Sequence, residues 1–224
     1  MDFVQAQHGY FDGRNGRRWI VIHSMEYPRR SGAARWCANY FKGPNAPRKS
    51  AHYCLDDGEI IQTMREADGA WHTPGFAAGL EVNRHSIGIE HAGYARQTAA
   101  QWLSGSELER SAALAADIAL RNSIPVRRLT VAQIRAGEPG IAGHVDFTHA
   151  TGSGDHVDPG PDFPWDTYLS RVNAHQSGEV SPGLPDGGPS PLKILLVAGI
   201  AGIGVWALMN PAQAQRAARR ILPF

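Results

Sequence analysis

The stretch WIVIH, residues 19–23, decides the fold of this chain. Trp19 to Ile22 form an uninterrupted apolar run, which is typical of a fully buried strand. The run ends on His23, so an imidazole stands where the strand leaves the core. SIGIE, residues 86–90, has the same arrangement and ends on Glu90. We therefore expect buried strands whose polar ends gather at one edge of a sheet.

The segment between these two strands predicts a helix followed by a hairpin. Apolar residues recur at helical spacing in SGAARWCANYFK, residues 31–42, and Gly43-Pro44 stops that helix. Two short apolar runs, HYCL and EIIQTM, flank Asp56-Asp57-Gly58, which is a hairpin signature. The aspartates are therefore interpreted as turn formers and not as catalytic carboxylates.

The second half of the domain begins with the longest predicted helix, residues 106–123. Ser106 and Glu109 have the spacing of a capping box at its start. A last strand over residues 141–146 and a closing helix over residues 166–173 follow. Strands interspersed with helices predict an α/β fold with a mixed central β-sheet flanked by helices. The tryptophans at 19, 36 and 102 are interpreted as core residues.

Composition divides the 224 residues into three parts. Residues 1–174 have the make-up of one compact domain, and residues 175–191 form a linker rich in Ser, Gly and Pro, which favours a solvated chain. Residues 192–224 form a separate apolar tail with a basic end.

The first 191 residues carry a net charge of −3, which argues against a nucleic-acid-binding domain. Cys37 and Cys54 are interpreted as buried thiols, with a disulfide as the alternative.

The tail contains an apolar run, ILLVAGIAGIGVWALM, at residues 194–209. As a helix it would span about 24 Å, against about 30 Å of bilayer hydrocarbon, so membrane insertion is the favoured prediction. Docking on the soluble domain or self-association is the alternative. The arginines after the run place the C-terminus inside and the domain outside. The N-terminus has no signal-peptide pattern, so the tail could instead hold the protein at the inner face until the membrane is breached.

Imidazoles and carboxylates at the predicted strand ends could form a metal site. His23, Glu90 and His144 each follow a short apolar run, and His156 and Asp158 lie two residues apart. Pro159 favours an extended Asp158, which would point both side chains to the same side. Catalytic zinc takes three His, Asp or Glu ligands and keeps one open position. A zinc site is one interpretation, and structural histidines are the other.

Five motifs in order also resemble a known family. They are VIHSMEYP around His23, SAHYCLDDGEIIQ at 50–62, AWHTPG at 70–75, NRHSIGIEHAGYA at 83–95, and GHVD with DHVDPGPDFPW within 143–165. Together they resemble the type-2 N-acetylmuramoyl-L-alanine amidases, zinc enzymes related to peptidoglycan-recognition proteins. The amidase modules of actinobacteriophage endolysins look the most similar. The resemblance covers about residues 5–172.

The resemblance implies a role for each motif residue. His23, His144 and Asp158 would be the zinc ligands, and Glu90 the general base. His156 stands where many members have a lysine that stabilises the oxyanion. His72 would line the substrate site, and Trp71 would line a glycan groove. Other members place a catalytic tyrosine at the position of Ala51. Tyr53 would share a strand face with Ala51, which makes it a reserve candidate.

The histidine at position 156 is a departure with a physical consequence. Lysine is charged at pH 7, whereas an unperturbed imidazole is mostly neutral, so the site should be more sensitive to pH. The resemblance nevertheless predicts an active zinc amidase of bacterial peptidoglycan that acts in the cell wall or periplasm, of the kind that phages use for lysis. A binding-only recognition module, a host wall-recycling amidase and a membrane-perturbing protein are the alternatives.

Overall fold

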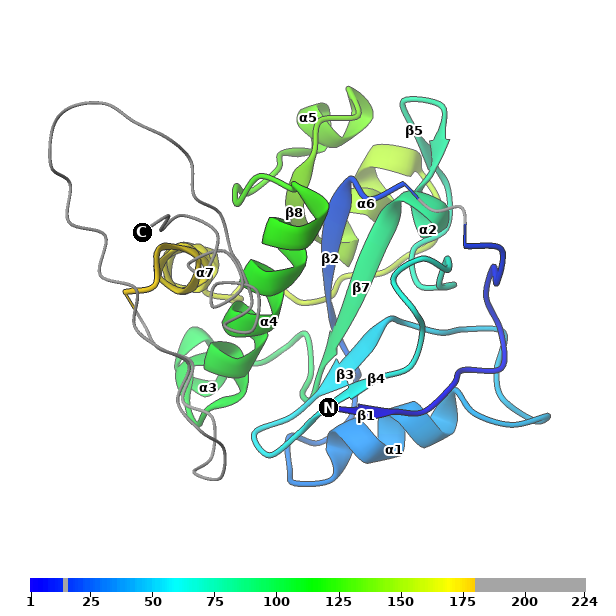
Figure 1. Ribbon diagram of the computed structural model, residues 1–224. Helices are drawn as coiled ribbons and strands as arrows, with labels where there is room; N and C mark the ends of the chain where they lie inside the picture. Colours follow the sequence, from blue (N-terminus) through cyan, green and yellow to red (C-terminus); the bar gives the residue numbers. More distant parts are fainter. Residues whose placement is uncertain (14–15, 180–224) are drawn as a thin grey trace, which may run out of the picture. The chain divides into compact units, whose positions relative to one another are not determined.

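The computed structural model describes residues 1–13 and 16–179, and within them a mixed sheet forms the centre of the molecule (Figure 1). Its six strands run in the order β1-β4-β3-β7-β2-β8. They are β1 (Asp2–Phe3), β2 (Trp19–Ser24), β3 (Tyr53–Leu55), β4 (Ile60–Gln62), β7 (Ser86–His91) and β8 (Gly140–Gly143). Helices pack against this sheet, so the expected mixed sheet flanked by helices is confirmed.

The strand that begins at Trp19 lies between β7 and β8 and runs parallel to both. All six of its residues are buried, as the apolar run predicts. The register pairs His23 with Glu90 on β7 and Ile22 with Gly143 on β8. Parallel strands end at the same edge of a sheet, so the polar residues at the ends of β2, β7 and β8 lie close together.

The predicted hairpin forms the other half of the sheet. β3 and β4 pair antiparallel, with Cys54 opposite Ile61. The carboxylate of Asp56 accepts backbone N–H bonds from Gly58 and Glu59 at 2.7 and 2.9 Å, which closes the turn. Its other oxygen accepts the Ala34 N–H at the start of α1 (Ala33–Tyr40), so one side chain holds both the turn and the helix.

Side-chain alternation along the strands sorts the core onto two faces. Ile20 and Ile22 pack with the long helix α4 (Glu107–Asn122) and with α7 (Trp165–Ser177). Trp19 and Val21 face the other way, toward α5 (Val131–Arg135) and α6 (His144–Thr151). His23 continues this second face, so its ring lies on the side away from α4. The remaining elements are β5 (Phe76–Ala77), β6 (Leu80–Glu81), α2 (Val82–His85) and α3 (Ala99–Leu103).

Several boundaries differ from the sequence prediction. The last strand ends at Gly143 and not at residue 146, because helix α6 begins at His144. The carboxylate of Asp146 accepts the Gly143 N–H at 2.8 Å, which satisfies a free donor at the helix start. Trp36 is also not a core residue: it is 39 % exposed and its ring stacks between those of Tyr27 and Tyr40. Trp19 and Trp102 are buried, as expected.

The capping box expected at the start of the long helix is absent. Ser106 makes no side-chain cap bond. The carboxylate of Asp57, from the hairpin, accepts the backbone N–H groups of Ser106 and Glu107 at 2.7 and 2.8 Å instead. A cap supplied by a distant segment leaves no local sequence pattern, so the sequence predicts only the nearby Ser106 as the cap.

Helix α7 (Trp165–Ser177) extends past the expected end of the domain at residue 174, so residues 175–177 of the expected linker are helical. Residues 180–191 of that linker and the whole tail, with the apolar run 194–209, lie outside the described residues. Among residues 1–13 and 16–179, no helix has the length and apolar character needed to cross a bilayer. Cys37 and Cys54 are buried free thiols.

Candidate metal centre and active site

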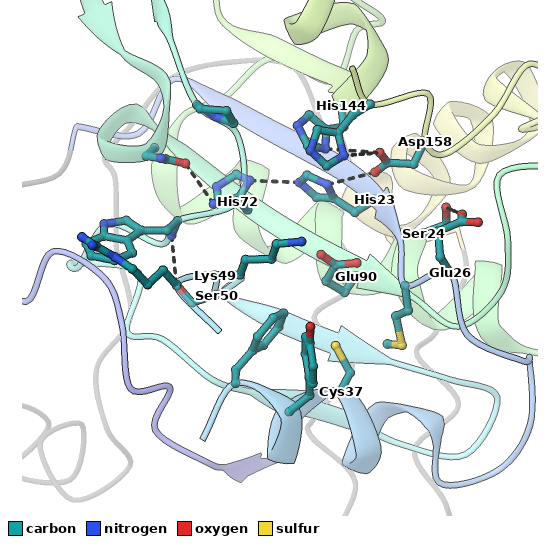
Figure 2. A pocket seen from close by; sticks show the side chains of 18 of the residues that line it. His23, Ser24, Glu26, Cys37, Lys49, Ser50, His72, Glu90, His144 and Asp158 are labelled. Atoms are coloured by element: carbon teal, nitrogen blue, oxygen red, sulfur yellow. Dashed lines mark hydrogen bonds and ion pairs between the residues drawn. The ribbon is translucent and has the colours of Figure 1, made fainter. Parts of the chain in front are cut away.

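The three residues expected to bind metal meet at the edge where the central strands end (Figure 2). His23 is the fifth residue of β2, and His144 is the first residue of α6, directly after β8. Asp158 comes from the loop between α6 and α7. All three side chains are buried, and one ligand atom from each lies within 4.8 Å of the others.

The contacts among these groups define which atoms face a common point. Asp158 Oδ2 is 3.1 Å from His23 Nδ1, and Asp158 Oδ1 is 3.2 Å from His144 Nδ1. The centroids of the His23 and His144 rings are 4.7 Å apart, and the ring planes are inclined by 70°. Two imidazole nitrogens and one carboxylate are the donor set of many catalytic zinc sites, in which a fourth position stays open. The residues therefore fit a zinc ion.

The protonation states of His144 and Asp158 also suit a metal. Burial lowers the pKa of His144 to about 4, so its ring is neutral and a nitrogen lone pair is available. Burial opposes ionisation of Asp158, but hydrogen bonds from His144, His156 and His23 outweigh it and hold the pKa of that carboxyl far below its ordinary value. Burial opposes the charged form of His23 as well. Its hydrogen bond to Asp158 and the negative charge of Glu90 outweigh burial, so the pKa of His23 is raised overall.

Glu90 lies beside this cluster in the same cavity, which has a volume of about 700 Å³. Its side chain points into the cavity from the end of β7 (Figure 2). Burial raises the pKa of Glu90 to about 7, and the charge of His23 opposes that rise. A carboxyl group with this pKa can both take and give a proton near neutral pH.

His156 lies over the metal-site residues at the cavity wall. Its ring stacks on His144 at 3.9 Å, and its Nδ1 is 3.6 Å from Asp158 Oδ1. The side chain is 43 % exposed, so it can reach a molecule in the cavity. His156 and Asp158 therefore do point to the same side of their loop.

The three residues expected to contact substrate have different surroundings. Trp71 lines the cavity, with His8 stacked on its ring at 5.7 Å and the Arg48 guanidinium 5.3 Å from its centre. His72 also lines the cavity but is 8 % exposed and hydrogen-bonded on both ring nitrogens. Tyr53 is not among the cavity residues.

Tyr53 packs in the core on the α4 side of the sheet. Its hydroxyl donates to Glu66 at 2.7 Å. Ala51 packs with α1 instead, so the two residues do not share a face. Tyr53 therefore does not meet substrate in this cavity.

Sequence reasoning missed cavity residues that do not stand at strand ends. Arg48 and Lys49 come from the loop before β3, and the Lys49 amine extends toward Glu90 (Figure 2). Trp36, Cys37 and Tyr40 line the cavity from α1. The helical spacing predicted that these three share a helix, but nothing in the sequence indicated that this helix forms a cavity wall.

Comparison with known proteins is consistent with this site. Residues 14–161 match the family model described as N-acetylmuramoyl-L-alanine amidase. N-acetylmuramoyl-L-alanine amidase A of Achromobacter lyticus is 30% identical over 174 residues, which cover 73% of this chain and 88% of that protein. The 1,6-anhydro-N-acetylmuramyl-L-alanine amidase AmpD of Haemophilus influenzae is 28% identical over 191 residues, covering 76% of this chain and 92% of that protein.

The fold also has a counterpart among solved structures. The hydrolase AmiA of Staphylococcus aureus, crystallised with its ligand, superimposes with a TM-score of 0.58 at 19% identity. The match covers 81% of this chain and 85% of that chain. At this identity the likeness supports the shared fold alone.

Proposed function

Since the chain belongs to the N-acetylmuramoyl-L-alanine amidase family and is a peptidoglycan amidase, we propose that it cleaves the bond between the muramic acid lactyl group and L-alanine with a zinc ion held by His23, His144 and Asp158. The proposal rests on one observation. The ligand atoms of these three residues lie within 4.8 Å of one another, in a cavity that also contains Glu90.

The amide of the substrate is a poor electrophile with a poor leaving group. A bound zinc ion would polarise the scissile carbonyl and lower the pKa of a water molecule toward 7. Glu90 accepts the proton of the attacking water and delivers it to the leaving amine, for which its pKa of about 7 is suited. His156, when protonated, donates a hydrogen bond to the oxyanion of the tetrahedral intermediate. Trp71 contributes a flat apolar surface to the substrate site.

We assign the enzyme to lysis of the cell wall, as in a phage endolysin, on the resemblance of its five motifs to such modules. A second function is favoured by one relative. The protein of Haemophilus influenzae is named for a 1,6-anhydro-N-acetylmuramyl substrate, so a wall-recycling role on soluble muropeptides is the second candidate. The two functions differ in whether intact wall polymer or soluble muropeptide is the better substrate.

Digestion of purified peptidoglycan, analysed by mass spectrometry, tests the reaction. We expect intact glycan strands and free peptides that begin at L-alanine, and no products after chelation. New reducing-end sugars would identify a glycosidase and contradict the proposal. A parallel assay on a soluble 1,6-anhydromuropeptide separates the two roles, because a recycling enzyme prefers that substrate and a lytic enzyme prefers the polymer.

Two variants link the reaction to the metal site. His23→Ala and Asp158→Ala should lose both bound zinc and activity, because each removes a ligand. His149→Ala is the matched control, since His149 is an exposed histidine of α6 outside the cavity. Retention of zinc and full activity in Asp158→Ala would show that the metal is held elsewhere.

A further inference from the structure

Both ring nitrogens of His72 are occupied by protein groups. Nδ1 lies 2.9 Å from His23 Nε2 and 2.8 Å from the Thr73 hydroxyl. Nε2 lies 3.1 Å from the Ser86 hydroxyl. Because the residue is 8 % exposed and its polar atoms are engaged, its main partner is His23 and not a molecule in the cavity.

The far end of this hydrogen-bond chain sets its direction. Ser86 Oγ lies 2.7 Å from the backbone carbonyl of Val82, which can only accept. The single hydroxyl proton of Ser86 is therefore directed at Val82, and Ser86 Oγ must accept from His72 Nε2–H. A neutral His72 with its proton on Nε2 has an acceptor at Nδ1. That nitrogen has one lone pair, so the contact with His23 Nε2 requires a proton on Nε2, and the Thr73 hydroxyl shares the same lone pair.

We propose that His72, Ser86 and the Val82 carbonyl form a one-directional hydrogen-bond chain that keeps a proton on His23 Nε2 and so presents His23 Nδ1 to the metal. His72 is a positioning residue in this arrangement. The inference rests on the proposed zinc site, because Nδ1 of His23 is the nitrogen that faces Asp158. Metal-ligating histidines commonly donate their other N–H to a fixed acceptor, which orients the ring and increases its basicity.

The surrounding backbone is built to hold the His72 ring. A Cβ at Gly88 would lie 2.7 Å from His72 Nδ1, so the glycine on β7 provides the space that the ring occupies. The backbone N–H groups of His72 and Thr73 both donate to the Asn83 side-chain oxygen, at 3.0 and 2.7 Å. The loop and the ring are thereby fixed relative to the sheet.

The second imidazole ligand lacks such support. His144 Nε2 is buried and has no hydrogen-bond partner among the described residues. The ring of His144 is instead restrained by its place at the start of α6 and by stacking on His156. The chain through His72 therefore acts on one ligand only, and its loss should weaken metal binding without abolishing it.

The zinc dissociation constant of the full-length protein, measured by competition with a chromophoric chelator, tests the proposal. His72→Phe keeps a ring of similar volume and removes the acceptor, so we expect the dissociation constant to rise about 10- to 100-fold. His72→Asn loses the ring but places an amide oxygen near the position of Nδ1, so it should bind zinc within about threefold of the parent. If His72 only fills space, the order of the two variants is reversed, and that result overturns the proposal.

A second measurement does not depend on how the variants fold. Nitrogen-15 shifts of the imidazoles in the zinc-loaded parent protein report which ring nitrogen carries the proton. We expect protons on Nε2 of His23 and on Nε2 of His72, and a proton on His72 Nδ1 overturns the proposal. Failure of the parent protein to bind zinc would instead refute the proposed zinc site itself. Zinc binding that is equal in the parent and in His72→Phe refutes only the hydrogen-bond chain.

Discussion

Glu90 is placed so that its carboxyl group can exchange protons at neutral pH. Burial raises its pKa to about 7, so the group is protonated and inactive as a base below that value. We expect kcat/KM to rise with pH and to level off at or below about pH 7, because a bound cation favours the ionised form. The measurement is a pH–rate profile on a defined muropeptide.

The Glu90→Gln variant provides the companion experiment. It should retain zinc, since Glu90 is not one of the three clustered ligands, and lose most activity together with the acidic limb of the profile. General-base catalysis is typically worth about 10²- to 10⁴-fold, which sets the expected loss. A fully active Glu90→Gln protein would remove Glu90 from the mechanism.

His156 can be tested separately from the metal ligands. Its exposed ring lies against His144, from which it can reach an oxyanion formed in the cavity. Loss of one such donor typically costs about 10²- to 10³-fold in rate, so we expect a fall of that size in kcat for His156→Ala. His156→Lys should recover part of the loss because it restores a donor. Zinc content is measured in parallel, and an unchanged kcat in His156→Ala would exclude the oxyanion role.

The site residues were predictable to different degrees for physical reasons. His23 and Glu90 end apolar runs, so the sequence placed them at a sheet edge, and the register now pairs them directly. Asp158 lies in an irregular loop, where spacing alone does not distinguish a metal ligand from a structural residue and only the motif resemblance identifies it. The contact between His72 and His23 joins a loop to a strand 49 positions away and has no sequence pattern.

At the scale of elements, the start of α4 depends on the hairpin. The Asp57 carboxylate accepts two backbone N–H groups of that helix and pairs with Arg29 at 2.8 Å. Removing a helix cap typically costs about 0.5–2 kcal/mol, so Asp57→Ala should lower the free energy of unfolding by about 1–2 kcal/mol. Urea denaturation followed by circular dichroism measures this change.

The residue predicted as the cap from the sequence serves as the comparison. Ser106 Oγ donates to the Asp57 carbonyl and does not cap α4, so Ser106→Ala should destabilise the protein less than Asp57→Ala. The opposite order would mean that the local capping box operates in solution. Strand and helix positions followed from periodicity, whereas this cap did not, because it is a contact between segments about 50 residues apart.

At the scale of the whole molecule, the sheet order is the part that periodicity could not provide. Strand ends and an antiparallel hairpin were predictable, but the placement of β2 between β7 and β8 is a long-range outcome. It follows from burial: the strand with six buried residues takes an interior place, where neighbours pair with both of its edges. The same interior place brings His23 between the two segments that supply Glu90 and His144.

The apolar run 194–209 lies outside the described residues, and its sequence alone predicts that the full-length protein binds membranes. An aspartate at the centre of a membrane helix costs about 2.5–3.5 kcal/mol, so the double variant Ile200→Asp and Val205→Asp should abolish co-flotation with anionic liposomes. Activity on a soluble muropeptide should be unchanged, because neither residue belongs to the proposed site. Equal flotation of the parent and the variant would mean that the run docks on protein or self-associates. In that case the lytic role would have to be explained by the amidase domain alone.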